Sequence, residues 1–298
     1  MFLLFYCDHH DIPLPPGHKF PMEKYKLIRN ELERQPGFRF APGPLASRED
    51  LLRVHDPAYV DAFLEMRLDP AAIRRIGFPQ VPRLVSRTLS SVGATVAASF
   101  RALSDGFSGV LAGGTHHAYR DFGSGFCVLN DIAVAARCLI DRRLIERALV
   151  IDLDVHQGDG TASIFREDPR VFTFSAHGRH NFPFRKQQSD FDLEFDNGAT
   201  DEVYLDRLAA ALPKVLSQPA GIVFYQAGVD ALASDRLGKL ALTHSGLARR
   251  DQMVFSAIRD LRLPCVVTQG GGYASPITDT VLASANVFRA AAQILRPI

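Results

Sequence analysis

Three carboxylates and an imidazole follow one apolar run in the middle of the chain. Residues 148–151 indicate a buried strand, and the polar residues after it are Asp152, Asp154, His156 and Asp159. A buried aspartate is costly unless it binds a cation or a charged hydrogen-bond partner. Residues two apart in an extended chain share a face, so Asp154 and His156 can contact one ion, and Asp152 lies on the same face. The pattern predicts a metal site at the end of this strand.

Three other loops also follow predicted strands and carry residues suited to chemistry. Residues 113–117 end in His116 and His117, two imidazoles of which one can act as a general base. Residues 228–230 add the carboxylate of Asp230, and the glycines of residues 270–273 can aim the Tyr273 hydroxyl at a reacting carbonyl. Taken singly, these loops are explained equally well as a polar loop, a helix N-cap and a flexible turn. Their occurrence together favours one site.

Asp154, His156 and Asp230 make a three-ligand set of nitrogen and oxygen donors. A set that leaves room for water and substrate suits a catalytic zinc better than a closed structural one. Zinc lowers the pKa of water to about 7 from 15.7, so a nearby imidazole suffices to complete deprotonation. These residues predict hydrolysis of a carbonyl compound.

Composition is that of an ordinary enzyme domain. The chain has 298 residues, of which 47% are hydrophobic, and it is expected to form one domain over residues 1–298. A net charge of +1 predicts neither nucleic acid nor a membrane surface as a direct partner. The apolar residues 1–7 are too few for a signal peptide or a membrane span, and the four cysteines are scattered, so a cytoplasmic protein is expected. We expect a monomer or a homodimer.

Short apolar runs alternate with segments of helical period, which predicts an α/β domain with a mostly parallel sheet flanked by helices. The expected strands are residues 1–7, 109–112, 148–153, 171–175, 221–226 and 265–269. The expected helices are residues 83–103, 131–140, 201–216, 246–261 and 277–295. The polar loops follow the strands, and ligands of open parallel sheets bind at that edge.

Five motifs occur in a characteristic order: GGTHHA, GFCVLNDIA, DLDVHQGDG, QAGVDAL and GGGY. In this combination the chain resembles the zinc-dependent histone deacetylase superfamily, which includes acetoin utilisation proteins and acetylpolyamine amidohydrolases. The resemblance implies an eight-stranded arginase/deacetylase-like sheet. It also implies removal of an acetyl or other acyl group from an acylated lysine of a protein or peptide, or from a small acylated amine.

The resemblance implies a role for each polar residue of the motifs. Zinc is expected on the three-ligand set described above. His117, backed by Asp159, is expected to act as general base and later as acid. His116, backed by Asp152, is expected to lie close to the carbonyl and leaving group, and Tyr273 to donate to the oxyanion.

The family encloses the acyl-lysine chain in a narrow tunnel. Gly125 and Phe126 match one wall, Phe182 or Phe184 matches the opposite wall, and Gly272 is also expected to belong to the tunnel. The family also commonly binds potassium. The positions that match its first site are Asp152, Asp154, His156, Ser175 and Ala176, and those that match a second site are Phe165, Asp168 and Val171.

One loop departs from the class I enzymes of the family. Residues 73–83 carry no aspartate where those enzymes hold the substrate backbone, and the chain looks closer to class IV and bacterial members. Two other functions are alternatives. A dimanganese ureohydrolase of the arginase type requires D-x-H-x-D, which is one residue shorter than the spacing here. A non-catalytic acyl-lysine binding module would have lost Tyr273, His117 or a zinc ligand, and none is lost.

Overall fold

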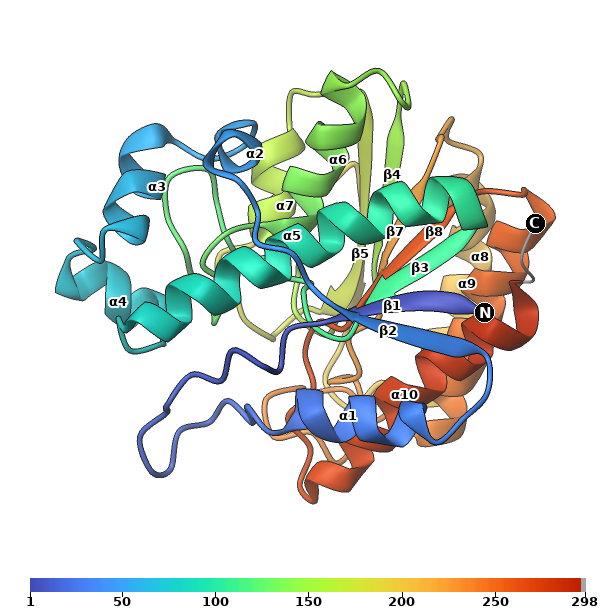
Figure 1. The fold of residues 1–298 in the computed structure, drawn as a ribbon. Coiled ribbons are helices and arrows are strands. Elements are labelled where there is room, and N and C mark those ends of the chain that lie inside the picture. Colours follow the sequence, from blue (N-terminus) through green and yellow to red (C-terminus); the bar gives the residue numbers. More distant parts are fainter. Residues whose placement is uncertain (296–298) are drawn as a thin grey trace.

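The computed structural model describes residues 1–295, in which eight strands form one parallel sheet. Their order across the sheet is β2-β1-β3-β8-β7-β4-β5-β6 (Figure 1). The strands are β1 (Phe2–Tyr6), β2 (Phe38–Pro42), β3 (Phe107–Val110), β4 (Ala148–Asp152), β5 (Val171–Gly178), β6 (Phe191–Phe195), β7 (Val223–Gln226) and β8 (Cys265–Thr268). The predicted fold class is therefore confirmed, with every strand pair parallel.

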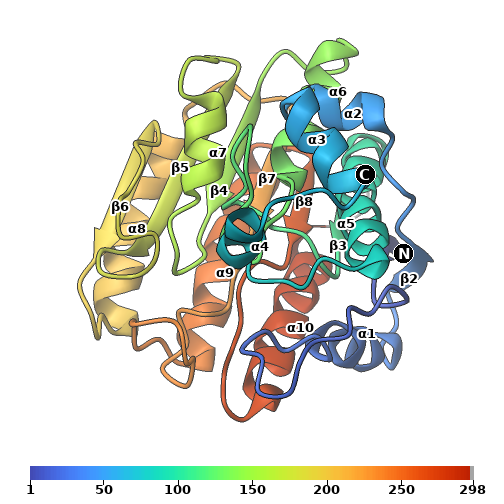
Figure 2. The ribbon, with the colours of Figure 1, turned by 90° about the vertical axis from the view of Figure 1, so that its left-hand side faces the viewer.

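Helices cover both faces of the sheet. On one face α1, α10, α9 and α8 pack side by side in this order, as Figure 2 shows, and the opposite face is covered mainly by α5 and α6. The helices are α1 (Lys24–Glu33), α2 (Arg48–Leu52), α3 (Pro57–Leu64), α4 (Pro70–Ile76), α5 (Pro82–Asp105), α6 (Asp131–Asp141), α7 (Asp159–Phe165), α8 (Asp201–Leu216), α9 (His244–Asp260) and α10 (Ile277–Ile294).

The central strands are apolar on both sides because each side faces a helix layer. In β4, Leu149 and Ile151 belong to the core beneath α8, α9 and α10, whereas Ala148 and Val150 belong to the core beneath α5 and α6. This burial makes the strand a rigid support for the polar residues that follow it.

The two edge strands, β2 and β6, were not predicted. An edge strand has one neighbour and is partly solvated, so it accommodates Arg39 and Pro42 in β2 and Asp192 and Glu194 in β6. Such strands lack the continuous apolar run by which the central strands were found. The last three residues of the expected 1–298 domain lie outside the described residues. Within residues 1–295, no helix has the length and apolar character needed to cross a membrane.

Candidate metal centre

The sheet order brings the four polar loops to one edge. Asp154 follows β4 and Asp230 follows β7, and these strands are neighbours, with Asp152 opposite Gln226. The loop with the two histidines follows β3, and the loop with Tyr273 follows β8, which lies between β3 and β7. Residues from distant parts of the sequence therefore meet because the carboxyl ends of parallel strands share an edge.

Asp154, His156 and Asp230 converge on one point. His156 Nδ1 lies 3.0 Å from Asp154 Oδ1 and 3.0 Å from Asp230 Oδ2. One ligand atom from each residue lies within 4.8 Å of the other two, and all three residues are buried. The remaining oxygens accept backbone bonds, at 2.6 Å from the Gly271 N–H to Asp154 and at 2.9 Å from the Val155 N–H to Asp230. These bonds fix both carboxylates in place.

The electrostatics of this group call for a cation. Burial and the nearby charge of Asp154 raise the pKa of Asp230 to about 7. Burial opposes protonation of His156, but the two carboxylates outweigh it and raise its pKa to about 10. Two carboxylates and one imidazole nitrogen are donors that zinc accepts, so the residues fit this metal. A Cβ added at Gly271 would overlap the Asp230 carboxylate, which explains why backbone without a side chain closes over the group.

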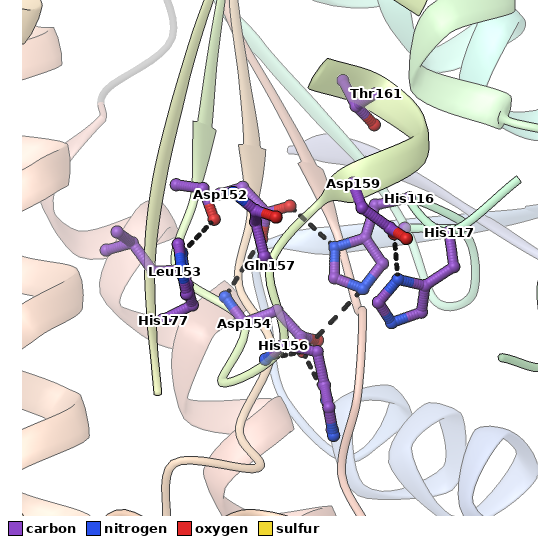
Figure 3. Close-up of polar contacts among 12 residues, drawn as sticks. His116, His117, Asp152, Leu153, Asp154, His156, Gln157, Asp159, Thr161 and His177 are labelled. Carbon is purple, nitrogen blue, oxygen red and sulfur yellow. Dashed lines mark hydrogen bonds and ion pairs between the residues drawn. The ribbon is translucent and has the colours of Figure 1, made fainter. Parts of the chain in front are cut away.

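Two carboxylate–imidazole pairs stand beside the three-ligand group (Figure 3). His116 Nδ1 donates to Asp152 at 2.7 Å, and His117 Nδ1 donates to Asp159 at 2.6 Å. Asp159 also accepts from the Tyr119 hydroxyl at 2.9 Å. These bonds orient both rings. They leave His117 Nε2 free to accept a proton, whereas His116 Nε2 lies 3.9 Å from Asp154 Oδ1.

The two imidazoles differ in charge although their ring centroids are 4.0 Å apart. Burial opposes protonation of His116, but Asp152 and Asp154 outweigh it and raise its pKa to about 9. Burial and the charge on His116 together lower the pKa of His117 to about 4, against the opposing effect of Asp159. Neighbouring groups whose pKa values are driven apart can divide the acid and base roles. His117 is the neutral member, which can accept a proton.

Asp131, at the start of α6, holds the histidine-bearing turn. Its buried carboxylate accepts from the Gly114 N–H at 3.1 Å, the Thr115 N–H at 2.8 Å and the hydroxyls of Thr115 and Thr95 at 2.6 Å each. Sequence reasoning gave this residue no role. The available signal was its place in the GFCVLNDIA motif, at the first residue of a predicted helix.

Tyr273 is positioned by Asp235 and Arg236. Asp235 accepts from the Tyr273 N–H at 2.6 Å, and Arg236 Nε donates to the Tyr273 carbonyl at 2.9 Å. Burial and the charges of Asp230 and Asp154 raise the pKa of Tyr273 well above its ordinary value. The hydroxyl therefore keeps its proton at neutral pH and remains a hydrogen-bond donor.

A pocket of about 140 Å³ opens onto these groups. Residues that line it include His116, His117, Asp154, His156, Tyr273, Gly125, Phe126 and Phe182. The Phe182 ring packs edge-on against His117 at 4.9 Å between centroids. Phe184 is 84% exposed and does not line the pocket, so the wall opposite Phe126 is formed by Phe182. Gly272 also lies outside the lining, and its carbonyl accepts from Lys24 Nζ at 3.3 Å.

The residues named for potassium fall in two places. Ser175 pairs with Asp152 across β4 and β5, and buried Ala176 follows it. At the second place the Asp168 carboxylate accepts from Arg137 at 2.6 Å and from Arg170 at 2.7 Å. The Phe165 and Asp168 carbonyls accept bonds from the Asp168 and Val171 N–H groups. Potassium binding at both places stays a prediction.

A buried arginine of α9 joins two of the site loops. Arg250 Nη1 donates to the Leu153 carbonyl at 3.2 Å and to the Gly228 carbonyl at 2.7 Å. Its charge is balanced by Asp251, which accepts from Arg250 Nε at 2.9 Å and from the Tyr225 hydroxyl at 2.5 Å. Because Leu153 precedes Asp154 and Gly228 begins the turn to Asp230, Arg250 fixes the separation of these two loops. Sequence reasoning missed it, since an arginine in a helix is ordinarily solvated.

Replacing Arg250 with methionine is expected to lower the free energy of unfolding by about 3–5 kcal/mol, because Asp251 is left buried and unpaired. Urea denaturation followed by circular dichroism measures the change. The matched control is Arg249→Met, which removes an exposed arginine from the neighbouring position of the same helix. Equal stability of the two variants would show that the buried network contributes little.

Comparison with known proteins places the chain in a family. Residues 18–288 match the family model described as histone deacetylase domain. An uncharacterized protein of Picosynechococcus sp. is 46% identical, with 98% of this chain and 99% of that protein covered. Histone deacetylase 2 of Arabidopsis thaliana is 33% identical, with 76% of this chain and 62% of that protein covered. The chain thus spans less than two thirds of the plant enzyme.

Solved structures share the fold. The crystal structure of an HDAC homolog complexed with SAHA superposes with a TM-score of 0.83 at 23% identity, over 98% of this chain and 84% of that one. An HDAC homolog from Aquifex aeolicus also gives 0.83 at 23% identity, over 97% and 83% of the two chains. The family match covers most of the chain and includes all four loops of the site. The chain belongs to the histone deacetylase family.

Proposed function

We propose that the protein is a zinc-dependent amidohydrolase that removes an acetyl or other acyl group from an acylated lysine side chain or a similar acylated amine. One observation carries the proposal: Asp154 and His156 of the three-ligand group, the imidazoles of both carboxylate–imidazole pairs and Tyr273 all line the same pocket. Family membership supports a hydrolase of the deacetylase type.

Asp154, His156 and Asp230 would hold the zinc. Zinc, when bound, supplies Lewis-acid polarisation of the substrate carbonyl and of water. His117 Nε2 takes the proton from the attacking water, while the bond from Nδ1 to Asp159 keeps the ring oriented and stabilises the imidazolium that forms. The same proton can then pass to the amine as the C–N bond breaks.

Two further groups act on the reacting carbonyl. The Tyr273 hydroxyl donates to the oxygen on which negative charge develops. His116 lies beside the leaving group and carries positive charge through its bond to Asp152. Its charge also disfavours a second proton on His117, which keeps the base ready at neutral pH.

The geometry favours one metal over the arginase-type pair. A second ion would need its own ligands beside the first, but the Asp159 carboxylate is occupied by His117 and Tyr119. Within residues 1–295, one group of three such side chains has ligand atoms close enough to share an ion: Asp154, His156 and Asp230. A binding module is disfavoured because the base and the oxyanion donor are both present and oriented.

The residues at the pocket entrance are the basis for a proposal about which substrates the protein accepts. In the segment that lacks a rim aspartate, Arg75 instead donates to the Gly123 carbonyl at 3.2 Å and stacks on Phe122, 4.4 Å from its ring centroid. Without that carboxylate, the site lacks the hydrogen-bond acceptor that would bind a peptide backbone tightly. We therefore propose a class IV-like or bacterial-type deacylase, formed by one catalytic domain over residues 1–298, with small acylated amines or non-histone lysines as substrates.

Metal analysis tests the proposal. Purified protein is expected to contain about one zinc per chain and to hydrolyse acetyl-lysine peptides or acetylated polyamines. Dialysis against a chelator should remove both the metal and the activity, and zinc should restore the activity. The control is the same treatment followed by magnesium, which should restore nothing. Full turnover by metal-free protein would overturn the proposal.

A further inference from the structure

A second, smaller cavity adjoins the site pocket. Its volume is about 50 Å³, against about 140 Å³ for the site pocket. Both are lined by Phe20, Tyr25, Gly113, Thr115 and Phe126, so these residues form a shared wall. This cavity therefore lies beside any acyl group that is bound in the site pocket and is longer than acetyl.

The second cavity contains a buried cation. Arg87, on α5, lines it and is 7% exposed. Its Nη1 donates to the Cys7 carbonyl at 2.9 Å, and its guanidinium carbon lies 4.4 Å from the Tyr25 ring centroid. Among the described ion pairs of residues 1–295, none involves Arg87, whereas the buried Arg250 has its own carboxylate in Asp251. Most of the five N–H donors of Arg87 are left for another acceptor.

A buried positive charge without a carboxylate partner is costly, which makes this arginine unusual. The rest of the cavity is mainly apolar, with Leu84, Val92, Val128 and Leu129 in its walls. The hydroxyl-bearing Thr88 and Ser91, from the same helix as Arg87, also line it. An aliphatic chain with a terminal carboxylate matches this combination, because the walls accept methylene groups and a guanidinium can bind a carboxylate in bidentate fashion.

We propose, on the basis of the function proposed above, that Arg87 binds the distal carboxylate of a short dicarboxylic acyl group. The protein then hydrolyses lysine amides of the succinyl or glutaryl type in addition to acetyl-lysine. Water adds its oxygen to the acyl carbon, the amide C–N bond breaks, and a proton passes to the amine. The products are the free lysine amine and a dicarboxylate, so no oxidant or further reactant is needed.

Cavity size limits the acyl chain. A water molecule occupies roughly 10–15 Å³ of cavity volume, so the second cavity of about 50 Å³ has room for about three to five waters. That space suits a carboxylate with a neighbouring methylene and excludes a long fatty chain.

Matched substrates test the charge recognition. The kcat/KM values for a succinyl-lysine peptide and for its neutral succinamoyl analogue are compared, since the two acyl groups have nearly the same size. Zinc-loaded wild-type protein is expected to prefer the succinyl peptide by about 10- to 100-fold, the range for a hydrogen bond to a charged group. Arg87→Gln, which keeps a donor for the Cys7 carbonyl, should remove the preference. Arg83→Met, an exposed arginine one turn away on α5, should retain it.

Calorimetry gives a second readout that needs no turnover. The succinyl-lysine peptide is titrated into the Tyr273→Phe protein with and without Arg87→Gln, and the second substitution should weaken binding about 10-fold or more. If no acyl-lysine peptide is hydrolysed, the proposed function fails, and calorimetry still decides whether the cavity binds the carboxylate. The cavity proposal is overturned by equal kcat/KM for the two peptides, by equal affinity of the succinyl peptide for the two proteins, or by a preference that survives Arg87→Gln.

Discussion

The His117→Ala protein is expected to bind about one zinc per chain yet to hydrolyse acetyl-lysine peptides about 10²- to 10⁴-fold more slowly, the usual contribution of a general base. The imidazole contacts Asp159 and lies outside the three-ligand group, so its removal takes away the proton acceptor and leaves the donors untouched. Zinc content by atomic emission and kcat from initial rates are the two measurements.

The companion variant is Asp230→Ala, which is expected to lose both the metal and the activity. Its carboxylate contributes one donor to the group and also orients the Val155 N–H. Asp230→Asn keeps the shape and a hydrogen-bond acceptor, so it separates loss of the ligand charge from loss of folding. His180→Ala, at an exposed position, serves as the histidine control. If the His117 and Asp230 variants had the same zinc content, the assignment of base and ligand would be wrong.

Replacing Tyr273 with phenylalanine should lower kcat by about 10²- to 10³-fold while KM and zinc content change little. One preorganised oxyanion donor contributes about 2.7–4 kcal/mol to transition-state stabilisation, and the hydroxyl is the only group removed. The Tyr273 ring packs 6.2 Å from the Phe126 ring between centroids, and that packing survives the substitution.

The matched control is Tyr6→Phe, a half-buried tyrosine outside the pocket lining. Circular dichroism of both variants checks that the fold is intact. An unchanged kcat in the Tyr273→Phe protein would assign the hydroxyl to another task, such as holding the loop.

The parallel sheet and its loop-bearing edge were predictable because they follow from local patterns. The buried run of β4 and the polar residues after it predict that Asp154 and His156 belong to the site. The rule that the carboxyl ends of parallel strands share an edge predicts that Asp230 and Tyr273 lie near them. The order of the strands in the sheet could not be predicted from the sequence, because β8 pairs with β3 and β7 although more than a hundred residues separate it from β3.

Supporting residues were harder to predict because their surroundings come from the folded structure. Asp131, Asp235 and Arg250 are common residue types at helix starts, in loops and in helices, and nothing in their local sequence shows that they are buried. The sequence could not distinguish Phe182 from Phe184 for the same reason, because the loop backbone decides which of the two rings turns inward.

The central position of β8 has a consequence for biosynthesis. This strand fills the gap between β3 and β7, yet it is the last strand to leave the ribosome. Until it is inserted, the nascent chain consists of two half-sheets, with the paired imidazoles attached to one and the carboxylate donors to the other. Pairing of the two imidazoles with Asp152 and Asp159 must therefore be among the final events of folding, and an interrupted translation product would expose apolar strand edges that quality-control chaperones bind.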